Sequence, residues 1–152
     1  MALHFTIQEF KSRENRVIES MKEKNLDALL LFRQESMYWL TGYDTFEYVF
    51  FQCLVLTSLG DKILLTRVPD LRQAQNTSNI KDIRIWIDQE NANPFINLKD
   101  ILNELKLTKK QIGVEYNAYG LTGNNAIKLN EKFEKFAYLS DQSYLISKLR
   151  LT

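Results

Sequence analysis

The chain has 152 residues, of which 45% are hydrophobic, and it contains only 5 Gly and 2 Pro. This composition is typical of one globular domain and excludes a disordered or fibrous segment. The 20 Lys and Arg residues nearly balance the 19 Asp and Glu residues, so no general electrostatic attraction to nucleic acid or to an anionic membrane is expected.

The first predicted helix begins near Thr6, which forms a capping box with Glu9. Phe5 and Phe10 have the spacing of a hydrophobic staple across this start. The apolar run at 27–32 that follows the helix is too short for a buried helix and is bounded by charged residues. It is therefore predicted to be a strand that is covered on both faces.

The next segments predict a short helix and a hairpin. Residues 34–41 have helical potential that ends at Gly42. The apolar segments 48–57 and 62–67 then flank a tight turn, which is the pattern of an antiparallel hairpin. The sheet is therefore expected to be mixed.

Beyond the hairpin, helices and strands alternate. The predicted order is a polar helix from Pro69, a strand at 83–88, a helix capped by Asn93, a strand at 111–116, a helix from Thr122, a strand at 136–141 and a helix in 142–152. This interleaving predicts an α/β fold with a helix-flanked, mixed sheet of roughly six strands. The apolar pattern runs up to Thr152, which favours either a chain that continues or a terminal helix docked on the sheet.

Side chains for common catalytic chemistry are scarce. The one His4 and the one Cys53 provide neither a metal-ligand pair nor a His-based triad, and no glycine-rich phosphate loop is present. Cys53 lies in a predicted strand and is interpreted as a small buried side chain. The first ten residues lack the features of an export signal, and no apolar run approaches the roughly 18 residues that span a bilayer. A cytoplasmic protein is therefore expected.

The most distinctive stretch is aromatic, "MYWLTGYDTFEYVFFQC" at 37–53. Met37, Trp39 and Leu40 are predicted to form the inner, core-facing side of the short helix. Beyond Gly42, rings and carboxylates lie in a connection, where side chains tend to be displayed. Such a connection favours the rim of a ligand pocket, a protein contact, or a packed aromatic loop.

Residues 13–67 resemble the N-terminal domain of the creatinase and prolidase family of hydrolases, also called the Xaa-Pro peptidase family. The matching elements are the segment from Arg13 to Arg16, the helix end "KNLD", the strand "ALLLF", the "MYWLTGYD" helix and turn, and the hairpin. The segment "IGVEY" at 112–116 looks like a later strand of that domain, so the resemblance covers essentially the whole chain.

The resemblance implies a mixed six-stranded sheet with helices on both faces, in a ribonuclease H-like arrangement. It also implies a domain at 1–141, with 142–152 as the start of a linker helix to a C-terminal catalytic domain. Peptidase members hold divalent metals such as Mn, Co or Zn in that catalytic domain, and no cofactor is expected in this segment. The N-terminal domain of such proteins supports a homodimer and narrows the active site, including that of the partner subunit.

By the same resemblance, the rim of the substrate pocket is formed by Tyr43, Asp44, Phe46, Tyr48 and Phe50. Tyr48 falls where creatinase-like members place an aromatic residue that contacts substrate. Phe50 falls near the position of an arginine that binds the substrate carboxylate in creatinase, which argues against creatine as substrate.

The leading hypothesis is a non-catalytic domain of an Xaa-Pro dipeptidase or aminopeptidase-like hydrolase that acts on a small peptide. A creatinase-like or ectoine-hydrolase-like enzyme for a small amide is the first alternative. A stand-alone module that binds a small ligand or a protein is the second. A third, that the chain is itself an enzyme using Asp44, Glu47 or Glu115, requires two of these carboxylates to converge.

Overall fold

The computed structural model describes residues 5–45 and 50–151, and within them it has one six-stranded sheet in the order β4-β3-β2-β1-β5-β6. The strands are β1 (Ala28–Leu31), β2 (Cys53–Thr57), β3 (Lys62–Arg67), β4 (Asp82–Trp86), β5 (Gln111–Val114) and β6 (Tyr138–Asp141). The helices are α1 (Ile7–Glu23), α2 (Gln34–Thr41), α3 (Val68–Thr77), α4 (Pro94–Glu104), α5 (Gly123–Phe133) and α6 (Leu145–Arg150).

The sheet is mixed, as the hairpin predicted. Strand β2 is antiparallel to both β1 and β3, whereas the pairs β1–β5, β3–β4 and β5–β6 are parallel. One consequence is that β1, β3, β4, β5 and β6 all end at the same edge of the sheet, where β2 begins. We call this the carboxyl edge.

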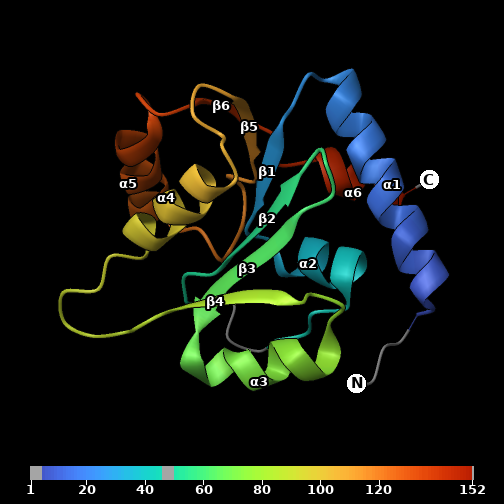
Figure 1. Cartoon of the computed structure of the whole chain (residues 1–152), viewed down its shortest axis with the longest axis horizontal. Helices are drawn as coiled ribbons and strands as arrows, with labels where there is room; N and C mark the ends of the chain where they lie inside the picture. The colour runs from blue at the N-terminus through green and yellow to red at the C-terminus, as the bar shows by residue number, and fades with distance from the viewer. Residues whose placement is uncertain (1–4, 46–49, 152) are drawn as a thin grey trace.

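Helices cover both faces of the sheet (Figure 1), with α4 and α5 on one side and α1, α2 and α6 on the other. In β1, Ala28 and Leu30 pack with the α4–α5 side, while Leu29 and Leu31 pack with the α1–α2 side. This alternation follows from the two-residue period of a strand. It explains why β1 is apolar at every position and confirms the predicted strand covered on both faces.

Local signals set several helix ends as the sequence predicted. The hydroxyl oxygen of Thr6 accepts a hydrogen bond from the backbone N–H of Glu9 (3.1 Å), and the ring centroids of Phe5 and Phe10 lie 5.8 Å apart. Helix α2 ends at Gly42, whose φ of 84° is left-handed, a conformation that glycine adopts without steric cost. Among the described residues, no helix has the length and apolar character needed to cross a bilayer.

Trp39 is less buried than the prediction that it lies on the core-facing side of α2 implies. Met37 and Leu40 are buried, but Trp39 is only half-buried. Its side chain still packs against the core cluster that contains Met37 and Leu40. The guanidinium groups of Arg13 and Arg16 lie 5.2 and 5.8 Å from the centre of its ring. Trp39 therefore borders the core and also joins α2 to α1 through cation–π contacts.

Candidate functional site

The five predicted rim residues have different positions in the structure. Tyr43 is fully buried, Asp44 is half-buried, and Phe50 is 38% exposed. Phe46 and Tyr48 lie outside the described residues, so their predicted roles stay predictions. The expectation that the side chain of Tyr43 is displayed is wrong for this chain.

Tyr43 is buried because a polar partner is buried with it. Its hydroxyl donates a hydrogen bond to Oε1 of Gln52 (2.7 Å), and the same oxygen accepts from the hydroxyl of Thr66 (3.1 Å). Removal from water raises the pKa of Tyr43 to about 12, with weaker opposing contributions from Thr66 and Thr45. The phenol therefore stays neutral at physiological pH and acts as a fixed hydrogen-bond donor below the connection.

The ion pair between Arg67 and Asp70 contacts the described residues on both sides of segment 46–49. The hydroxyl of Thr45 donates to Oδ1 of Asp70 (3.4 Å), whose Oδ2 lies 3.7 Å from Nε of Arg67. The guanidinium of Arg67 also stacks 3.5 Å from the centre of the Phe50 ring. The pair Arg67–Asp70, at the carboxyl edge, thus fixes both flanks of the predicted rim.

A first groove, the Phe50 groove, has a volume of about 850 Å³ and is lined by the connection, the β4–α4 loop and α5. Its aromatic wall consists of Phe50, Phe51, Trp86 and Phe95. The indole N–H of Trp86 donates to the backbone oxygen of Phe51 (2.9 Å), and the rings of Phe51 and Phe95 pack 4.9 Å apart. These contacts make the wall mainly core, with the predicted rim residue Phe50 at its border.

A second groove, the strand-end groove, has a volume of about 680 Å³ and was not predicted from the sequence. It is lined by Arg33, Gln34, Glu35, Thr45 and 117–120. These residues follow β1 and β5, which are parallel neighbours, and open α/β sheets commonly bind ligands outside the carboxyl ends of such strands. The sequence predicted both strands, but it carried no sign that they pair.

The strand-end groove contains both charges and amides. Nε of Arg33 donates to Oε2 of Glu35 (3.3 Å), and Nη1 of Arg33 donates to the backbone oxygen of Ser143 (3.4 Å). The amide nitrogen of Gln34 donates to the backbone oxygen of Tyr43 (3.2 Å). Within the described part of the chain, the buried Oε1 of Gln34 accepts no hydrogen bond.

Glu115 lies beneath this groove and is 1% exposed. Its Oε1 accepts from the backbone N–H groups of Phe32 (3.1 Å) and Arg33 (3.0 Å), and its Oε2 accepts from the hydroxyl of Ser36 (2.6 Å). Desolvation raises the pKa of Glu115 to about 7, although these hydrogen bonds oppose the rise. With both oxygens engaged, Glu115 acts as a cap that joins the end of β5 to the start of α2.

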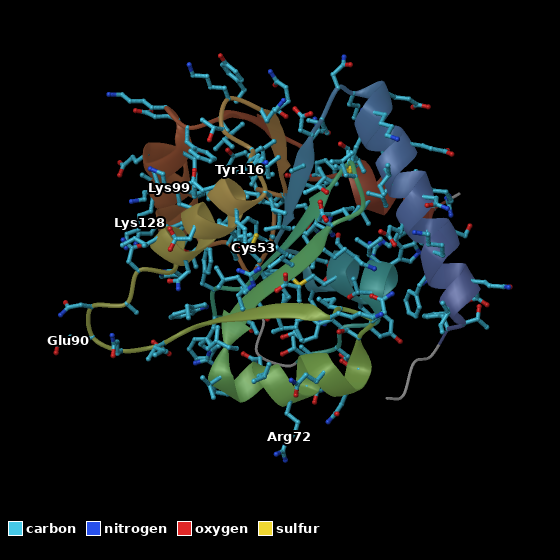
Figure 2. The ribbon with its side chains drawn as sticks, in the orientation of Figure 1. Cys53, Arg72, Glu90, Lys99, Tyr116 and Lys128 are labelled. Carbon is cyan, nitrogen blue, oxygen red and sulfur yellow. The ribbon has the colours of Figure 1, made fainter. Side chains whose placement is uncertain are left out.

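Cys53, the one cysteine of the sequence, is completely buried and forms no disulfide. Figure 2 shows it in the middle of the molecule, and burial raises the pKa of its thiol well above the usual value. The interpretation of Cys53 as a small core side chain is confirmed. Across residues 5–45 and 50–151, no three His, Cys, Asp or Glu side chains gather in a way that would hold a metal ion.

Comparisons with known proteins find matches along most of the chain. The family model of the creatinase/prolidase N-terminal domain matches residues 13–152. An uncharacterized hydrolase/peptidase of Sinorhizobium fredii is 26% identical over 155 residues, which cover 97% of this chain and 39% of that protein. Ectoine hydrolase of Halomonas elongata is 30% identical over 91 residues, which cover 60% of this chain and 21% of that enzyme.

Among solved structures, a dipeptidase from Pyrococcus horikoshii superposes with a TM-score of 0.73 at 25% identity. The match covers 91% of this chain and 36% of that one. The chain therefore spans less than two-fifths of the length of each of these three relatives.

Proposed function

Because the chain belongs to the creatinase/prolidase N-terminal domain family, we propose that it is the non-catalytic N-terminal domain of a cytoplasmic, metal-dependent Xaa-Pro dipeptidase or aminopeptidase-like hydrolase. In this proposal, residues 142–152 begin the linker to a C-terminal catalytic domain, which binds the divalent Mn, Co or Zn ion. The observation that carries the proposal is the family match along 13–152. The similarity to a dipeptidase of which this chain spans 36% supports it.

The part assigned to the chain is to support a homodimer and to shape the pocket for a small peptide. Support comes from the Arg67–Asp70 pair, which holds Thr45 and Phe50 on either side of the predicted rim. Connections that are held by a rigid scaffold are common places for binding residues.

The test compares the protein encoded by the complete reading frame with residues 1–152 alone. Both are assayed with glycylproline, with and without Mn²⁺, and their masses are measured by light scattering. We expect metal-dependent hydrolysis only from the complete protein, and we expect the complete protein to be a dimer. Hydrolysis by residues 1–152 that survives repurification, or a complete protein that neither cleaves a peptide nor binds metal, would contradict the proposal.

A second candidate is a small-amide hydrolase, which is favoured by the 30% identity to ectoine hydrolase over 91 residues. Adding ectoine to the same assay separates the two, because the peptidase proposal expects turnover of glycylproline and the second candidate expects turnover of ectoine. A reading frame that ends at Thr152, with no hydrolysis of either compound, would instead support a stand-alone binding module.

A further inference from the structure

The strand-end groove has the size and place of a small-ligand site. Its volume of about 680 Å³ lies within the usual range of ligand pockets. Its walls come from the start of α2, from Thr45 and from segment 117–120, so three separate parts of the chain converge on it. A groove built from several elements at the carboxyl edge is a better candidate for a site than a gap beside one helix.

A pair of oppositely charged side chains, Arg33 and Glu35, lines this groove. The side chains of Arg33 and Glu35 are 21% and 48% exposed, and their contact of 3.3 Å is long for a charged hydrogen bond. An exposed pair of this kind contributes little to stability, so exchanging it for a ligand costs little. Among the described residues, Arg33 uses two of its five N–H groups on protein atoms. The others are available for a carboxylate.

Gln34 adds an acceptor to the same wall. Its amide nitrogen is held by the backbone oxygen of Tyr43, which fixes the direction of the side chain. Its Oε1 is buried and receives no hydrogen bond from the described residues, whereas most buried acceptors in proteins have a donor. A ligand N–H group would supply the missing donor.

We propose that the strand-end groove binds a small zwitterion of the amino acid or dipeptide class. The guanidinium of Arg33 binds its carboxylate, Glu35 binds its ammonium group, and Oε1 of Gln34 accepts an N–H. The site belongs to this chain alone and does not depend on the proposed hydrolase. A failure here leaves the hydrolysis assay of the complete protein unaffected, and a failure of that assay leaves this site testable.

The experiment is an NMR titration of the ¹⁵N-labelled 152-residue chain with three probes. Glycylglycine carries both charges, N-acetylglycylglycine keeps only the carboxylate, and glycylglycinamide keeps only the ammonium group. We expect glycylglycine to shift the amide signals of 33–35 and 117–120, and each blocked probe to bind about tenfold more weakly, because each loses one charged contact. Shifts confined to other regions, or equal binding of all three probes, would overturn the proposal.

Two variants locate the charge recognition. Arg33→Gln should weaken glycylglycine binding at least about tenfold, whereas Arg72→Gln should leave it unchanged. Arg72 is an exposed arginine of α3 that points away from the body of the molecule (Figure 2), and it provides the matched control.

A third variant guards against a structural effect, since Arg33 also bonds the backbone of Ser143. Glu35 is exposed, and among the described residues its side chain pairs with Arg33 alone, so Glu35→Gln should leave the fold intact. It should weaken glycylglycine but not N-acetylglycylglycine, which has no ammonium group. Unchanged glycylglycine binding in both the Arg33 and the Glu35 variants would refute the assignment.

Discussion

Replacing Glu115 by Gln should remove a loss of stability that the protein otherwise undergoes as the pH rises. Glu115 is buried, and desolvation raises its pKa from 4.5 to about 7. Its carboxyl group is therefore harder to ionise in the folded chain than in the unfolded chain. Between these two values the folded state holds a proton that the unfolded state has lost, so the free energy of unfolding falls as the pH rises.

The size of the effect follows from the pKa difference. A rise from 4.5 to about 7, at about 1.4 kcal/mol for each pKa unit, corresponds to about 3 kcal/mol. The contribution of Glu115 is fully present below pH 4.5 and is lost once the pH passes about 7.

Gln is a close replacement because it preserves the local hydrogen bonds. Its carbonyl oxygen can accept from the backbone N–H groups of Phe32 and Arg33, as Oε1 of Glu115 does. Its amide nitrogen can donate to the hydroxyl of Ser36, which now donates to Oε2. The variant should therefore match the wild type near pH 4.5 and exceed its stability by up to about 3 kcal/mol above pH 7.

The assay is urea unfolding of both proteins, followed by far-UV circular dichroism from pH 4.5 to pH 8. The quantity of interest is the difference between the two free energies of unfolding at each pH, because the other titrating groups cancel in it. Glu90→Gln, at a loop residue that points into solvent (Figure 2), should give a flat difference. If the Glu115 difference is also flat, or if the wild type gains on the variant with rising pH, the carboxylate is stabilised as an anion and the reasoning is refuted.

Three further substitutions test packing and local structure, each measured by thermal unfolding with circular dichroism. Tyr43→Phe removes the hydrogen bond to Gln52 and should lower the free energy of unfolding by about 1 kcal/mol. An unchanged melting temperature would instead indicate that the side chain of Tyr43 is displayed to solvent. Gly113→Ala would bring a new Cβ within 2.5 Å of Cγ of Gln142 and should cost about 1–3 kcal/mol; a variant as stable as the wild type would show that this contact relaxes freely. Thr122→Ala removes the hydroxyl that caps α5 and should cost about 1 kcal/mol, and no loss would mean that water replaces the cap.

Helix boundaries were predictable because they depend on residues within one turn. Thr6, Asn93 and Thr122 each accept a backbone hydrogen bond two or three residues ahead, as the sequence predicted. Such short-range signals can be read along the chain. The alternation of apolar residues predicted the strands in the same way, although β2 begins at Cys53 rather than at residue 48.

Burial in the connection was not predictable, because it depends on partners from other elements. Tyr43 lies three residues after Leu40, beyond the end of α2, and both side chains are fully buried. Nothing in the sequence of the connection indicated that Tyr43 would be buried. The decisive partners are Gln52, just before β2, and Thr66 on β3, whose polar groups make it possible to bury a phenol. The burial of Tyr43 therefore depends more on the presence of a buried acceptor than on its position in a connection.

The strand-end groove was missed for a related reason, since its parts meet only through the parallel pairing of β1 with β5. That pairing joins residues more than eighty positions apart, such as Arg33 and Glu115, and no local pattern encodes it. Once the sheet order is known, however, two side chains are seen to lie at the carboxyl edge: Glu115 below the groove and Arg67 below the predicted rim. Both are buried ionisable side chains that hold a neighbouring segment by hydrogen bonds or ion pairs. The carboxyl edge thus holds buried ionisable side chains beside both the groove and the predicted rim, and substitutions at this edge should alter binding before they alter the core.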